Sequence, residues 1–276
     1  MEPVYITGAG CLRAPGFRSL AEMLGGGLSP ERENKFLRIE DIPPAPPTLK
    51  RFKRQSRAVQ LAALVTGEAL GEAGIPVPCP DGDKVAMVVG TDDANLDAIY
   101  KLNQEAEAYG VNNTSPGLFP DTVLNVTAGQ TAIYYGLSGP NVTISSGSAT
   151  SIRSLQYAVD LLASGSVSHV VVCAVHLAVP EIFRDNLRYQ THIESAASLV
   201  LSKQPLNGTG LRMSMKTRVN ESRADIIEIE DEELIAFAAL ALKENDGAQP
   251  CRLKIGSAAE RQYTVELDND VLTEDA

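Results

Sequence analysis

One sequence feature constrains the fold of this chain most. It is a short run of β-branched residues followed directly by small residues that must form a tight turn. Residues 141–144 (NVTI) are typical of a buried strand, and residues 145–148 (SSGS) leave room only for a tight turn before a helix that extends to about residue 163. The same alternation of short apolar runs with longer alanine- and leucine-rich stretches recurs along the chain. It predicts an α/β domain with buried strands.

The other elements follow from the same alternation. Gly8-Ala9-Gly10 is expected to end the first strand. Strands are expected over residues 4–7, 85–89, 142–144, 169–175, 196–202, 226–229, 252–255 and 263–267. Helices are expected over residues 56–73, 96–109, 121–135, from the corner to about 163, and 231–245. We expect one domain over residues 1–210 and an α/β extension over residues 211–276, packed on the same domain and ending in a frayed acidic tail.

The charge balance narrows the choice of partners. The 276 residues include 24 Lys and Arg against 35 Asp and Glu, which gives a net charge of −11. A surface this acidic repels phosphate backbones and anionic lipid, so we expect no nucleic-acid and no membrane partner. One basic cluster runs against the trend, and it is either solvated surface or a local site for an acidic partner. It consists of Lys50, Arg51, Lys53, Arg54 and Arg57.

The cysteines and the apolar stretches indicate a reducing compartment. Cys11, Cys79, Cys173 and Cys251 lack the spacing of a metal site or a disulfide framework, so we expect no metal, no other cofactor and a cytoplasmic location. The first ten residues lack the basic start and long apolar stretch of a signal peptide. Residues 161–179 carry no charged side chain other than histidine, but a Ser-Gly-Ser break predicts a helix end and a buried strand, not a bilayer helix.

The corner is also where chemistry is expected. Ser148 falls in the first turn of the following helix, where unpaired N–H groups and the helix dipole favour a nucleophile or an oxyanion. The small residues Gly147, Ala149 and Thr150 would allow a substrate to approach closely. The alternative is that the serines of the corner only cap the helix. Asp92 and Asp93, after an expected strand, are interpreted as turn and cap residues.

Short segments follow one another in a characteristic order. They are Tyr5-Ile6-Thr7-Gly8, Val88-Val89-Gly90-Thr91, Phe119-Pro120, Leu137-Ser138-Gly139-Pro140-Asn141, Ile144-Ser145-Ser146-Gly147-Ser148-Ala149-Thr150-Ser151, Val170-Val171-Val172 and Glu194-Ser195-Ala196-Ala197-Ser198-Leu199-Val200-Leu201. This order is similar to that of the N-terminal half of β-ketoacyl-acyl-carrier-protein synthases, and the resemblance covers roughly residues 3–205. The Gly-Pro turn, strand, corner and helix are its specific part.

The resemblance implies that Ser148 stands where the family has its acylated cysteine. A cysteine at a helix N-terminus is readily poised as a thiolate, whereas a serine needs a positioned base. The family also uses two histidines and a lysine from its C-terminal half, and we expect no counterpart of that half here. His176, near the carboxyl end of an expected strand, is the only reachable base, because His169 begins that strand and His192 is interpreted as structural.

The resemblance further implies a layered αβα thiolase-like fold with a mixed five-stranded sheet in the one recognisable lobe. A lone lobe is expected to leave apolar surface exposed, which normally marks an obligate interface. In the family, subunits pair by edge strands near the corner. The interface is therefore assigned to Asn141, Val142, Ile144 and Tyr135. The substrate wall is assigned to Phe119, Gln130, Tyr134, Gly147 and Thr150.

Three functions fit these features. The leading one is a non-catalytic, chain-length-factor-type partner of a ketosynthase in polyketide, aryl polyene or specialised fatty-acid biosynthesis, as a heterodimer with the ketosynthase. The second is an acyltransferase or thioesterase with Ser148 as nucleophile and His176 as base. The third is a self-associating homodimeric pseudoenzyme that binds acyl carrier protein.

Overall fold

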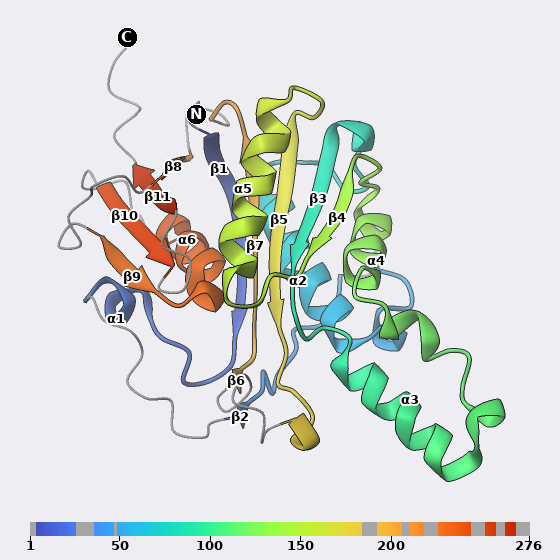
Figure 1. Cartoon of the computed structure of the whole chain (residues 1–276). Helices are drawn as coiled ribbons and strands as arrows, with labels where there is room; N and C mark the ends of the chain where they lie inside the picture. The colour runs from blue at the N-terminus through green and yellow to red at the C-terminus, as the bar shows by residue number, and fades with distance from the viewer. Residues whose placement is uncertain are drawn as a thin grey trace, which may run out of the picture.

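The computed structural model describes residues 4–25, 36–46, 49–183, 192–205, 210–217, 226–243, 252–257 and 263–268. Within these residues, nine strands form one mixed sheet with helices on both faces (Figure 1). The spatial order is β4 (Asn141–Ile144), β3 (Val85–Gly90), β5 (His169–His176), β7 (Ser195–Ser202), β1 (Val4–Arg13), β8 (Leu211–Thr217), β11 (Tyr263–Asp268), β10 (Arg252–Ser257) and β9 (Ile227–Ile229).

The five strands expected for the lobe lie together at one end of this sheet. There β4, β3 and β5 are parallel, and β7 and β1 are antiparallel to their neighbours. The thiolase-like α/β fold is therefore confirmed, but a sheet of only five strands is wrong. Strand β8 pairs with β1 over Val4–Ile6 and carries β11, β10 and β9 into the same sheet. The division of the chain at residue 210 stays a prediction.

Each face of the sheet has its own apolar core. Helices α2 (Arg57–Glu72) and α4 (Val126–Tyr135) cover one face, and α5 (Thr150–Ala163) and α6 (Leu234–Lys243) cover the other (Figure 1). Every residue of α6 from 234 to 241 is buried, because the helix is apolar on all sides. Helix α6 therefore covers part of the α5 face with residues of the same chain.

Some expected elements begin or end elsewhere. The acidic residues expected to open α6 instead form η9 (Asp231–Glu233), a separate 3-10 turn. The helix expected over residues 121–135 starts only at Val126, after η4 (Phe119–Thr122), which contains Pro120. The shorter or unexpected elements are α1 (Leu20–Leu24), β2 (Phe36–Leu37), β6 (His192–Ile193), η1 (Phe52–Arg54), η2 (Gly82–Lys84), η3 (Val111–Asn113), η5 (Gly147–Ala149) and η6 (Glu181–Phe183). The acidic tail lies outside the described residues.

Helix α3 (Leu96–Tyr109) stands apart from the rest. It buries only Ala98 among its fourteen residues and projects away from the sheet (Figure 1). Its amphipathic pattern was sufficient to predict the helix, and its main contacts within the described chain are with η3 and η4. The helix leads into residues 110–125, which contact α3 and then α4.

The glycines near the N-terminus do not end a strand, contrary to our expectation. Strand β1 continues through Gly8 and Gly10 to Arg13, with a bulge after Ile6. A Cβ added at Gly8 would lie 2.1 Å from the carbonyl oxygen of Ala69, and one at Gly10 2.1 Å from that of Val65. The glycines are needed because the backbone of α2 presses directly on β1.

The close α2–β1 contact gives a test. Gly10→Ala should lower the free energy of unfolding by about 1–3 kcal/mol or more, because its methyl group would meet rigid backbone. Gly71→Ala is the matched control, since a Cβ there meets nothing within 4 Å. That change should be neutral or stabilise the helix by about 0.5–1 kcal/mol. Urea unfolding followed by circular dichroism measures both, and equal stabilities for the two variants would contradict the contact.

Candidate functional site

The corner between β4 and α5 lies at the carboxyl end of the three parallel strands, where α/β proteins commonly bind ligands. Ile144 ends β4 beside Gly90 of β3, and η5 then leads into α5 at Thr150. Gly147 has a φ of 62°, in the left-handed region that side chains other than glycine rarely adopt. The predicted strand, tight corner and helix are confirmed, and Gly147 serves the turn.

Asp92 holds the corner together. It follows β3, and its carboxylate accepts hydrogen bonds from Thr150 Oγ1 at 2.7 Å, from the Gly147 amide at 3.2 Å, and from the Ser145 hydroxyl. Thr150 Oγ1 in turn accepts a hydrogen bond from the Ser146 amide at 2.8 Å. One side chain from β3 therefore fixes both ends of the turn.

Asp231 caps the helix that follows. The backbone amides of Ser151 and Ile152 donate to its two carboxylate oxygens at 2.6 and 3.1 Å. Asp231 belongs to η9, about eighty residues further along the chain, and it is buried. Since these are among the N–H groups that a helix leaves without an intrahelical partner, the expected binding place for an anion is already filled by the chain.

Ser148 and His176 reach the same edge of the sheet but are not joined. Ser148 is exposed, and its hydroxyl makes no hydrogen bond within the described part of the chain. His176 is the last residue of β5, is buried, and lies opposite Ser195 of β7. The neighbouring Asp93 is buried as well and accepts a hydrogen bond from the Leu177 amide at 3.0 Å. Burial raises the pKa of Asp93 well above its usual range.

The residues assigned to a substrate wall are scattered. Thr150 is fully buried and bound to Asp92, so its hydroxyl serves the corner. Phe119 is exposed on η4, while Gln130 and Tyr134 are half-buried on α4. Neither of the two cavities lined by residues 36–60 and 97–104 contains any of these side chains or Ser148 in its wall.

Tyr135 differs most from its expected place at an interface. The side chain is turned into the core against α2, and its hydroxyl donates a hydrogen bond to the carbonyl of Ala63. Burial raises the pKa of Tyr135. A Cβ added at Gly67 would lie 2.4 Å from that hydroxyl, so the glycine makes room for it. Tyr135 is therefore a core residue and does not lie at a wet rim.

Strand β4 has a free outer edge, and the chain before it carries exposed apolar side chains. Among the described strands β4 pairs only with β3, so its outer edge is free. Asn141 is exposed there, Val142 is half-buried, and Ile144 is half-buried against the core under α5. Five large apolar side chains are exposed along the chain from the end of α3 to α4, and we call them the apolar strip. They are Tyr109, Val111, Phe119, Val123 and Ile133.

The basic cluster is smaller than its sequence suggests. Arg57 is not part of the solvated surface, because its guanidinium makes a two-pronged ion pair with Glu194, at 2.6 and 2.7 Å. Glu194 is fully buried and also accepts a hydrogen bond from the Ile39 amide. Lys50, Arg51, Lys53 and Arg54 remain exposed beside a hollow of about 560 Å³ walled by residues 42–46 and Leu49.

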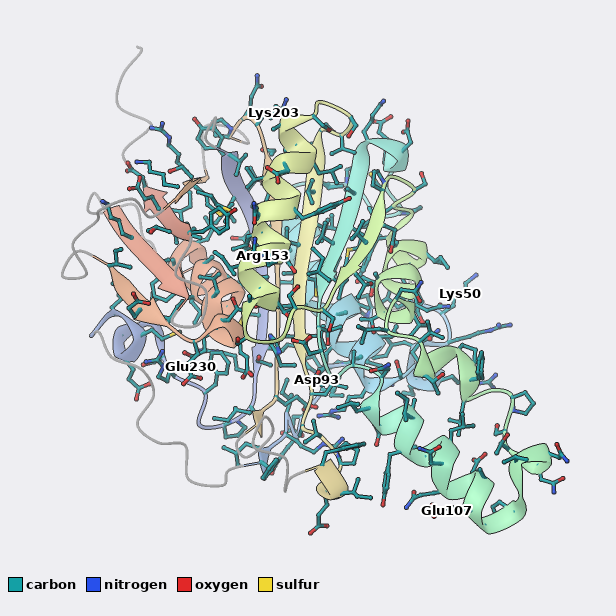
Figure 2. The ribbon with its side chains drawn as sticks, in the orientation of Figure 1. Lys50, Asp93, Glu107, Arg153, Lys203 and Glu230 are labelled. Carbon is teal, nitrogen blue, oxygen red and sulfur yellow. The ribbon has the colours of Figure 1, made fainter. Side chains whose placement is uncertain are left out.

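The basic cluster lies far from the acidic residues that precede α6 (Figure 2). Figure 2 shows Lys50 on the side of α2 and α4, with Glu230 on the opposite side next to the C-terminal strands. Among the described residues, no three His, Cys, Asp or Glu side chains are grouped so that they could hold a metal ion. No helix in the described ranges is both long and apolar enough to cross a bilayer.

A comparison with protein families identifies the chain. Residues 26–192, more than half of the sequence, match the Beta-ketoacyl synthase, N-terminal domain family. The chain belongs to this family. The resemblance inferred from the order of the short segments is thereby confirmed.

Two synthases similar to part of this β-ketoacyl synthase domain are distant relatives. The 3-oxoacyl-[acyl-carrier-protein] synthase 2 of Vibrio harveyi is 28% identical over 104 residues, which are 38% of this chain and 25% of that protein. The corresponding protein of Coxiella burnetii is 22% identical over 130 residues, 47% of this chain and 31% of its own. The matched part thus spans only a quarter to a third of these relatives.

Solved structures resemble the whole chain more evenly. A ketosynthase (ApeO) in complex with its chain length factor (ApeC) from Xenorhabdus doucetiae matches with a TM-score of 0.63 and 16% identity, over 98% of this chain and 100% of the other. AntDE:AntF, a type II PKS acyl-carrier protein in complex with its ketosynthase, matches with a TM-score of 0.70 and 14% identity, over 97% and 99%. At such identities the likeness shows the fold.

Asp92 and Asp231 organise the site, but only Asp92 could be recognised from the sequence around it. Asp92 follows a strand ending in Gly-Thr, and a carboxylate placed there at the carboxyl edge can be foreseen as a turn residue. Its three partners, however, depend on the pairing of β3 with β4. Asp231 gives no local signal for its role, because its partners lie in α5 and only the folded chain brings η9 beside them.

Asp231 and Ser148 should differ in how much their loss destabilises the protein. Asp231→Ala should lower the free energy of unfolding by about 1–3 kcal/mol, because two buried amides would lose a charged acceptor. Ser148→Ala should stay within about 0.5 kcal/mol of the unmodified chain, since the serine is exposed and unbonded. Chemical denaturation of the two variants side by side is the measurement. A larger loss at Ser148 than at Asp231 would contradict this account of the corner.

Proposed function

We propose that this chain is a non-catalytic partner subunit of a full-length ketosynthase and acts as a chain-length factor. In this role it closes the tunnel in which the partner extends an acyl chain, in polyketide, aryl polyene or specialised fatty-acid biosynthesis. Membership of the Beta-ketoacyl synthase, N-terminal domain family supports an association with ketosynthases. We assign this role to the cytoplasm.

The observation that carries the proposal is the apolar strip, and the free edge of β4 adds to it. Ile133 is 72% exposed on α4, and Phe119 and Val111 are exposed on the segments that precede it. A free strand edge and a group of exposed apolar side chains are each a liability for an isolated protein in water. A partner that adds a strand to β4 and covers the strip would remove both.

The corner supports a role without condensation. A serine stands at the position where the family resemblance places the acylated cysteine, and a serine hydroxyl needs a base within hydrogen-bond reach to act as a nucleophile. Ser148 has no such neighbour among the described residues. The amides of Ser151 and Ile152 are occupied by Asp231, so they are not available to an oxyanion. We therefore do not propose the acyltransferase or thioesterase function.

The exposed cations support a carrier protein as the second partner. Lys50, Arg51, Lys53 and Arg54 form a local positive surface on a chain whose net charge is −11. An acidic acyl carrier protein would be repelled by most of the molecule and attracted to this surface, which favours one orientation of approach. The ketosynthase and the carrier protein are thus assigned to different faces, the strip and the basic cluster.

The interface prediction uses two isoleucines of similar exposure. Ile133→Asp should weaken association with the ketosynthase by about 3 kcal/mol, roughly 100-fold in Kd, because a charge would be buried without a partner. Ile182→Asp is the control, since Ile182 is 64% exposed but lies on η6, outside the strip. The ketosynthase is first identified by purifying the tagged chain from its native cells, and both variants are then compared by analytical ultracentrifugation. Equal loss in both variants, or a stable monomer at micromolar concentration, would refute the interface.

Activity measurements separate the partner role from an enzyme. The purified chain should form no ketoacyl product from acyl- and malonyl-carrier protein. Its complex with the ketosynthase should form product, and Ser148→Ala should leave the rate of that complex within about twofold, as expected for a side chain that only contacts solvent. Product from the chain alone, or a collapse of the complex's rate in folded Ser148→Ala, would instead favour the serine enzyme. A homodimer purified without any ketosynthase would favour the self-associating pseudoenzyme.

A further inference from the structure

The start of α5 already holds two negative charges that belong to the chain. Asp231 accepts the amides of Ser151 and Ile152, and Asp92 accepts the amide of Gly147 together with the Thr150 hydroxyl. Residue 148 lies between these bonded groups. The positive end of the helix dipole at this corner is therefore neutralised from both sides of Ser148.

We propose that Asp92 and Asp231 are positioning residues that act as built-in anions, so that the corner keeps its shape without substrate and opposes a negative charge at residue 148. The proposal deepens the non-catalytic role proposed above and rests on it. In addition to the serine itself, the surroundings of Ser148 are then unsuited to a nucleophile.

The physical reason is that a helix N-terminus stabilises a new anion only while its N–H donors are free. An unfilled N-terminus offers N–H donors and a partial positive charge, and a thiolate placed there is stabilised. Here the amides of Gly147, Ser151 and Ile152 are engaged by carboxylates, so a further anion at residue 148 would meet like charge and fewer free amides. Both carboxylates also stabilise the fold, since Asp92 fixes the turn and Asp231 joins η9 to α5.

The proposal makes a distinct prediction for Ser148→Cys. A cysteine poised by a helix N-terminus would ionise well below the usual thiol range, whereas this one should react as an ordinary or less acidic thiol, with a half-maximal alkylation rate at pH 8.5 or above, taking about 8.5 as the free value. The measurement is site-specific alkylation of residue 148 by iodoacetamide across pH, read by mass spectrometry so that the native cysteines do not interfere.

Removing either charge should then change the thiol. In the Ser148→Cys background, Asp231→Asn and Asp92→Asn should each raise the alkylation rate at pH 7 roughly tenfold, which corresponds to about one unit of thiol pKa. Asparagine keeps the shape of the side chain and one oxygen that can accept a backbone amide, so each variant loses the charge while it retains part of the hydrogen bonding. Asp160→Asn is the matched control: Asp160 is exposed near the other end of α5, more than a Debye length away, and its loss should leave the rate unchanged.

A second probe keeps the test decisive if an asparagine variant does not fold. Ser148→Cys alone is alkylated with neutral iodoacetamide and with anionic iodoacetate. Two fixed carboxylates should disfavour the anionic reagent severalfold relative to the same pair acting on a cysteine peptide. A strongly acidic thiol in Ser148→Cys, no response to either asparagine, or no preference between the two reagents would overturn the proposal. Each of these outcomes leaves the partner role standing, because that role is tested by assembly and by condensation of the complex.

Discussion

The burial of α6 is the contact on which the rest of this structure depends. A sheet with two apolar faces needs cover on both, and residues 234–241 supply it on the α5 side with side chains that are all buried. The helix packs against β1 and β7, in the half of the sheet that the family resemblance describes, and its apolar cluster extends to β10 and β11. Because η9 immediately precedes α6, the same packing brings Asp231 to the start of α5.

The sequence was informative wherever a local pattern decides the outcome. The five strands of the lobe, the long helices and the corner at Ser145–Ser148 were predicted because apolar periodicity and turn residues are local properties. Strand β8 was missed although Leu211, Met213 and Met215 alternate with polar residues and are buried. Gly8 and Gly10 were misread because glycine in a strand marks a close backbone approach as well as a turn.

The site was harder to predict, since it depends on contacts between distant segments. Ser148 was located correctly at the corner, yet its surroundings come from Asp92 on one side and Asp231 on the other. Tyr135 and Arg57 were assigned to the surface as an aromatic and a cation, and each is instead engaged with a partner, the Ala63 carbonyl and Glu194. Residue type indicates what a side chain can bind, but only the fold decides which partner is within reach.

The strand order has a consequence for how the molecule unfolds. Strand β1 lies between β7, from the half that resembles the family, and β8, from the C-terminal part, so a single ten-residue strand is shared by both. Separating the two parts would break a backbone ladder at Val4–Ile6 and expose the core beneath α6 in one step. The two parts therefore stabilise each other. The molecule should unfold in a single cooperative transition in which neither part persists without the other.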